Sequence, residues 1–165
     1  MNLRKDRGIT ILMVLILIVI LTFIGGVLVW IVNLNIKSAG ALRRQKISFY
    51  YAEAGINHAI SILKNTYGVD ENENFTPLLL TAYNMGWAQV NDEGEVDGNG
   101  DWYLIPELSN FSFREGSYRV YLRDDQDDNP ENPFEDQNRV ILVRSLGNGP
   151  GDSKTLIEVE LELVP

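Results

Sequence analysis

The side chains best suited to chemistry in this sequence are the carboxylates of an acidic run between positions 124 and 136. This run holds seven Asp and Glu among its 13 residues. Calcium binds about 6–8 oxygen ligands and tolerates irregular loops, and crowded carboxylates repel one another unless a cation or water screens them. We therefore single out five aspartates as candidate calcium ligands, with a solvated acidic loop as the alternative: Asp124, Asp125, Asp127, Asp128 and Asp136.

Other site chemistries lack the side chains that they need. The sequence has no cysteine and a single histidine, His58, which excludes disulfide frameworks, thiol nucleophiles and zinc sites built from several Cys or His. No cluster supplies a nucleophile together with its base, so we expect that the protein is not an enzyme. Residues 65–165 hold 6 Lys and Arg against 21 Asp and Glu, and so acidic a region is expected to bind no nucleic acid.

The acidic run is expected to lie in a globular β-domain over residues 67–165. Apolar and polar residues alternate over 118–123 and 157–163, and residues 139–145 form a mostly apolar run. Alternation with a period of two is typical of strands that bury one face, and the Gly- and Pro-rich stretch 147–153 is typical of a hairpin connection. We expect an antiparallel sheet of three or four strands.

A long helix is expected before this domain, and its first half is apolar enough to cross a membrane. Residues 8–36 carry no charge, and residues 9–32 form a run of 24 almost entirely apolar residues. As a helix this run is about 36 Å long, against a hydrocarbon core of about 30 Å. It is too long for a cleaved secretory signal, whose apolar core is about 7–15 residues. We assign residues 9–36 to a single transmembrane span.

Residues 37–66 are expected to continue the same helix as an amphipathic segment. One apolar stripe should cover the domain core, with Phe49, Ile56 and Leu63 buried against Val159 and Leu161. The full stripe is Leu42, Phe49, Ala52, Ile56, Ala59, Ile60 and Leu63. The opposite side carries Ile47, Tyr51 and Ile62, and we expect that side to face another subunit.

The N-terminal half of the chain carries two motifs of a known family. A short basic leader, residues 1–8, ends in Gly8 and is followed by Ile9-Thr10 and the apolar run, and residues 49–55 read F-Y-Y-A-E-A-G. The leader resembles a class III prepilin signal, and the F-x-x-A-E-A-G box is similar to that of PilX-type minor pilins of the type IV pilus. The resemblance covers about the first 64 residues.

This resemblance implies a fold, a processing step and a set of partners. The fold is pilin-like and α+β, with a long N-terminal helix packed on a small antiparallel sheet. A prepilin peptidase would cleave between Gly8 and Ile9, the new terminus would be N-methylated, and the helix would pack among other minor and major pilins with the help of the inner-membrane assembly machinery. The protein would be a single-pass inner-membrane protein with a periplasmic domain, and later part of a pilus at the cell surface.

One position departs from the family pattern. The fifth residue of the mature chain would be Met13, where pilins usually have a glutamate that pairs with a neighbouring terminal amine. A carboxylate in the bilayer costs about 3 kcal/mol and is kept only for a partner, so Met13 indicates a subunit that does not need this pairing. PilX-type pilins also lack the glutamate, which implies a place near the filament tip.

Two functions remain open from the sequence. The first is a minor pilin-like structural subunit that helps to initiate or cap assembly of a type IV pilus or a related pseudopilus. The alternative is a membrane-anchored periplasmic binding domain that does not enter a filament and that could depend on calcium.

Overall fold

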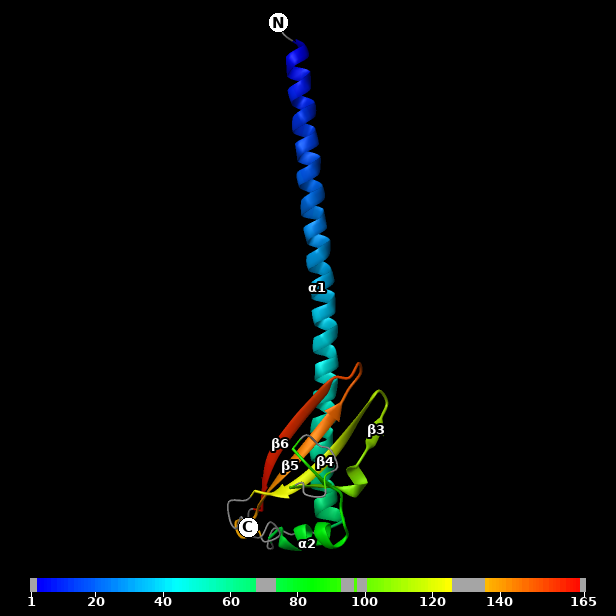
Figure 1. Cartoon of the computed structure of the whole chain (residues 1–165), viewed down its shortest axis with the longest axis vertical. Coiled ribbons are helices and arrows are strands. Elements are labelled where there is room, and N and C mark those ends of the chain that lie inside the picture. Colours follow the sequence, from blue (N-terminus) through cyan, green and yellow to red (C-terminus); the bar gives the residue numbers. More distant parts are fainter. Residues whose placement is uncertain (1–2, 68–73, 93–96, 98–100, 126–135, 164–165) are drawn as a thin grey trace. The chain divides into compact units, whose positions relative to one another are not determined.

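The computed structural model describes residues 3–67, 74–92, 97, 101–125 and 136–163, with only the backbone described for residues 3–10. The chain divides into two compact units, Met1–Arg43 and Arg44–Pro165. The first unit is helical, and the second is an α+β domain built on the end of the same helix, α1 (Leu3–Asn65) (Figure 1). A long helix packed on an antiparallel sheet is therefore confirmed for the second unit.

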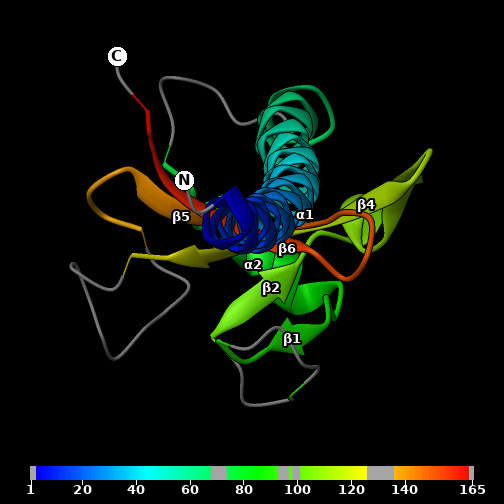
Figure 2. The same cartoon turned by 90° about the horizontal axis from the view of Figure 1, so that it is seen from above.

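The sheet is antiparallel throughout. Its three long strands, β4 (Gly116–Asp124), β5 (Val140–Asn148) and β6 (Lys154–Glu162), pair in chain order. The short strands β1 (Gln89–Val90) and β2 (Trp102–Leu104) extend it in the order β1-β2-β4-β5-β6, and β3 (Phe111–Phe113) pairs with the first part of β4 (Figure 2). β4 and β6 match the alternating segments of the sequence and β5 matches the mostly apolar run, whereas β1 and β3 lie where no pattern indicated a strand. β2 falls in the apolar segment 102–106, which the sequence allowed as a strand. The described sheet has six strands, not the three or four expected.

The core lies between the inner face of the sheet and the second-unit part of α1. Val120, Leu122, Ile141 and Val143 are fully buried on the central strands. Ile157, Val159 and Leu161 of β6 pack against the same cluster and are partly buried, as expected for an edge strand. The helices α2 (Thr76–Asn84) and η1 (Pro106–Leu108) add Leu78, Leu79 and Leu108.

The helix meets the sheet at unusually short range, at two glycines. A Cβ on Gly147 of β5 would lie 2.2 Å from the Ser48 carbonyl oxygen and 2.4 Å from the Ala52 nitrogen. A Cβ on Gly55 of α1 would lie 2.2 Å from the Ser145 side-chain oxygen. At Gly147 only glycine permits such an approach of backbone to backbone, and at Gly55 the missing side chain leaves room for Ser145. These two residues set how deeply the helix sits on the sheet.

The buried side of the helix differs from the expected stripe. Ala52, Ile56, Ala59 and Leu63 are buried as expected, but Phe49 is 46% exposed and Ile60 is 41% exposed. The buried line follows small residues, including Ser48 and Gly55, because the sheet lies too close for large side chains there. The expectation that Phe49 is buried against Val159 and Leu161 is therefore wrong. Leu42, the first member of that stripe, belongs to the other unit and is exposed.

We predict that Gly147→Ala lowers the free energy of unfolding of the second unit by about 3 kcal/mol, the upper end of typical overpacking costs, because the added methyl meets backbone atoms that cannot rotate away. Thermal unfolding of the full chain in detergent, followed by near-ultraviolet circular dichroism, measures the change. Gly25→Ala is the control, since a Cβ there meets nothing within 4 Å. Equal melting temperatures for the two variants would contradict the close helix–sheet contact.

Candidate functional site

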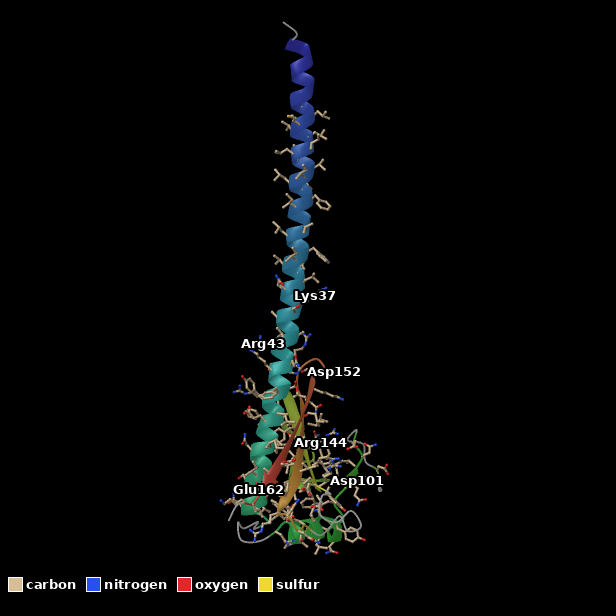
Figure 3. All side chains as sticks on the ribbon, turned by 90° about the vertical axis from the view of Figure 1, so that its left-hand side faces the viewer. Lys37, Arg43, Asp101, Arg144, Asp152 and Glu162 are labelled. Carbon is tan, nitrogen blue, oxygen red and sulfur yellow. The ribbon has the colours of Figure 1, made fainter. Side chains whose placement is uncertain are left out.

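The first candidate site is the apolar surface of α1 within the first unit. The large apolar side chains of residues 11–36 are exposed on all sides of the helix, among them Met13 at 68% (Figure 3). Among the described residues, α1 is the one helix long and apolar enough to cross a membrane. By length and composition it is a candidate membrane span, which is compatible with single-pass anchoring.

The backbone of the apolar segment is continuous, and the hydroxyl of Thr22 is satisfied locally. Thr22 Oγ1 donates a hydrogen bond of 2.8 Å to the Ile18 carbonyl oxygen, so this hydroxyl needs no partner from water in an apolar environment. The helix runs without a break through Gly25 and Gly26. Gly8 and Ile9, the expected processing positions, lie within α1, and their side chains are outside the described ones.

The second candidate site is an exposed face of α1 within the second unit, formed by Phe49, Tyr50 and Ile60, which we call the aromatic helix face. Tyr50 is 63% exposed, and its ring meets that of Phe49 edge-to-face with centroids 6.1 Å apart. Ala54 is also exposed. Large exposed apolar groups on a helix are what a neighbouring helix can pack against, so this face can dock a neighbouring helix.

The F-x-x-A-E-A-G box is divided between these two sides of the helix. Ala52 and Gly55 are buried at the close contact with the sheet, whereas Phe49, Glu53 and Ala54 are exposed. Packing within the domain therefore explains two of the small residues of the box, Ala52 and Gly55, but not the exposed Ala54. Ser48 and Gly55 were missed in the expected stripe because their size, not their hydrophobicity, marks the contact.

Tyr51 packs on its own domain rather than away from it. Its hydroxyl donates a hydrogen bond to the Phe113 carbonyl oxygen, and its ring lies where a Cβ of Gly116 would be. The expectation that Tyr51 faces another subunit is therefore wrong, because the β3–β4 hairpin folds over this side of the helix. Ile47 is half-buried, and nothing described tests a role for it in assembly.

His58 is a packing residue beside the same hairpin. Its Nδ1 lies 2.7 Å from the hydroxyl of Tyr118, and its ring packs edge-to-face on Phe111. Burial raises the pKa of the Tyr118 hydroxyl further above neutral pH, and this hydroxyl donates to or accepts from the imidazole according to the His58 tautomer.

The acidic run is described only at its ends. The carboxylate of Asp136 is fully buried and accepts hydrogen bonds from the backbone nitrogens of Phe75, at 2.6 Å, and Arg139, at 2.7 Å. Phe75 is the N-cap residue of α2, and Arg139 has a left-handed φ of 66°. Asp136 therefore caps a helix and holds a turn, which accounts for its burial without a metal.

Of the other four candidate ligands, two are described. Asp124 is buried at the end of β4, and Asp125 Oδ2 accepts a 2.7 Å hydrogen bond from the Asn138 side chain. Asp127 and Asp128 lie outside the described residues. Within the part of the chain that is described, no three His, Asp or Glu side chains form a cluster that could hold a metal ion. A calcium site in this run stays a prediction.

Comparisons with protein-family models, with curated proteins and with solved structures gave no match to this chain.

We predict that Asp136→Ala lowers the free energy of unfolding by about 2–4 kcal/mol, because two buried backbone donors lose a charged acceptor. The loss should be the same in millimolar calcium and in chelator. Thermal melts of wild type and variant under both conditions measure it. A loss that appears only with calcium would instead support Asp136 as a metal ligand.

Proposed function

We propose that this protein is a minor pilin-like structural subunit that helps to initiate or cap assembly of a type IV pilus or a related pseudopilus. Its apolar helix leaves the inner membrane and packs among the helices of other minor and major pilins, while its acidic domain remains on the periplasmic side and then on the filament surface. The resemblance to PilX-type minor pilins in the leader and in the F-x-x-A-E-A-G box supports this role.

The observation that carries the proposal is that two parts of α1 expose apolar surface, one before the domain and one within it. Its side chains at 11–36 are exposed and mostly apolar, and its C-terminal part packs on a sheet yet keeps the aromatic helix face exposed. An anchor alone would need only the apolar segment. An exposed Phe49–Tyr50 pair beyond that segment is favourable only if another surface covers it.

Met13 supports a position at the end of a filament rather than along it. Its thioether side chain carries no charge for the terminal amine of a neighbouring subunit, so this subunit relies on apolar packing for its place. A subunit without that pairing suits an initiating or capping position near the tip. The action of such a subunit is assembly and not catalysis.

We predict that the mature chain begins at Ile9 with a single N-terminal methyl group. Intact-mass and N-terminal peptide mass spectrometry of the protein from cells with an active prepilin peptidase tests this, and cells without the peptidase are the control. An intact Met1–Gly8 leader in both strains would contradict the proposal and favour the membrane-anchored binding domain that never enters a filament.

We predict that substitutions of two adjacent tyrosines affect different properties, filament number for Tyr50 and stability for Tyr51. Tyr50→Ala should leave the melting temperature unchanged and reduce the number of filaments, because Tyr50 is exposed on the aromatic helix face. Tyr51→Ala should lower the free energy of unfolding by about 2–4 kcal/mol, because its ring and hydroxyl pack on the β3–β4 hairpin.

Thermal melts and filament counts by electron microscopy measure both effects. Glu53→Ala, an exposed substitution on the same helix, is the control for stability. Normal filament numbers with Tyr50→Ala would remove the aromatic helix face from the assembly interface.

A further inference from the structure

The second unit contains two tripeptides of the form Asn-x-Ser/Thr, the acceptor motif for N-linked sugars in exported proteins. One motif spans residues 74–76 (Asn-Phe-Thr), and the other spans residues 110–112 (Asn-Phe-Ser). Neither has proline at its middle position, which would block the modification. Motifs this short arise by chance, so the surroundings of each asparagine decide whether a sugar can be attached.

The first motif is committed to the fold. Asn74 is exposed, but its side-chain nitrogen donates a hydrogen bond of 2.9 Å to the Asp136 carbonyl oxygen. The Thr76 hydroxyl accepts from the Asp136 backbone nitrogen at 3.0 Å and donates to its carbonyl oxygen at 3.2 Å. Asp136 is fully buried and caps α2. Releasing the two side chains that the motif requires would therefore loosen the start of this helix.

The second motif lies at the surface, next to an edge of the sheet. Asn110 occupies the turn between η1 and β3, and both Asn110 and Ser112 are exposed. Phe111 between them stacks on Tyr118 with ring centroids 5.1 Å apart, and alternation along the strand directs Ser112 away from that contact. Among the described strands, β3 pairs with β4 alone, over three residues (Figure 1). So short an edge strand opens at low cost, which lets the motif enter the site of an enzyme.

The same edge has little protection against pairing with another chain. None of the three residues of β3 is charged, and Phe111 and Phe113 are 41% and 59% exposed. The edge strand β6, in contrast, carries exposed glutamates. An uncharged and apolar edge favours association with a further strand. A bulky hydrophilic group attached beside β3 would prevent that association.

We propose that Asn110 is an N-glycosylation site. The co-substrate is a sugar carried on a polyisoprenyl diphosphate lipid, and a membrane-bound transferase supplies it. The Asn110 side-chain nitrogen attacks the anomeric carbon of that sugar. A carbon–nitrogen bond forms, the bond from the anomeric carbon to the diphosphate oxygen breaks, the lipid diphosphate leaves, and one amide proton passes to a base of the transferase. Ser112 is a positioning residue, because its hydroxyl is what the transferase recognises beside the acceptor. The inference requires only that the domain lies outside the cytoplasm, as in both candidate functions.

The test uses the full chain purified in detergent from its native cells. Proteolysis after glutamate separates the two motifs, because it releases residues 74–93 and 108–115 as different peptides. Tandem mass spectrometry then locates an added sugar on either peptide. Asn110→Gln removes the acceptor, Ser112→Ala removes the hydroxyl, and Ser112→Thr restores it. Asn57→Gln changes an exposed asparagine outside both motifs and is the matched control.

Wild type, Ser112→Thr and Asn57→Gln should carry the sugar on peptide 108–115, whereas Asn110→Gln and Ser112→Ala should lose it. Peptide 74–93 should be unmodified in every sample. Asn110→Gln should also aggregate faster than Asn57→Gln at an unchanged melting temperature, as light scattering measures, because β3 is then uncovered. An unmodified peptide 108–115 in wild type would overturn the proposal, as would a sugar that persists in Ser112→Ala. If the leader is cleaved in the same preparation, the proposed role in a filament stands even where the glycan fails.

Discussion

The contact between Gly147 of β5 and the helix backbone at Ser48 and Ala52 is the constraint on which the second unit depends. With no side chain between the two backbones, the helix can take only one depth and one rotation on the sheet. That rotation turns Phe49 and Tyr50 outward. The same contact thus fixes the core and leaves the aromatic helix face exposed. A larger residue at Gly147 would disturb both.

The elements that repeat a simple period could be predicted from the sequence, and the helix face could not. Strands β4 and β6 follow from alternation, because a strand that buries one face alternates with a period of two, and β5 follows from its mostly apolar run. The apolar run required a helix long enough for a membrane. The buried side of that helix was mispredicted because hydrophobicity favoured Phe49 and Ile60, whereas the close sheet selected small residues such as Gly55. Side-chain size at a backbone contact depends on how near the partner lies, and local periodicity does not contain that distance.

The candidate sites were harder to predict because they join distant parts of the chain. Asp136 belongs to an acidic run, which suggested a cation, but its carboxylate accepts the backbone N–H of Phe75, 61 residues earlier. The small cavity beside Tyr121 forms only when β2, with β1 beyond it, lies on one side of β4 and β5 lies on the other. In residues 65–116 the segment 102–106 allowed a strand, but nothing indicated β1 or the pairing of β2 with β4, so neither the cavity nor the network of Arg144 ion pairs around it could be foreseen.

The sheet and the helix differ in how well they suit contact with another chain. Among the described strands, β6 is an edge strand that pairs only with β5. Its outward positions carry Glu158, Glu160 and Glu162, all exposed. Charged side chains along an edge disfavour pairing with a further strand, and a second copy of this edge would add like charges. The aromatic helix face carries less of such a barrier, since Phe49 and Tyr50 are large, exposed and uncharged, although the exposed Glu53 lies one turn along from both. Association led by the helix is therefore favoured over extension of the sheet, as the proposed role in a filament requires.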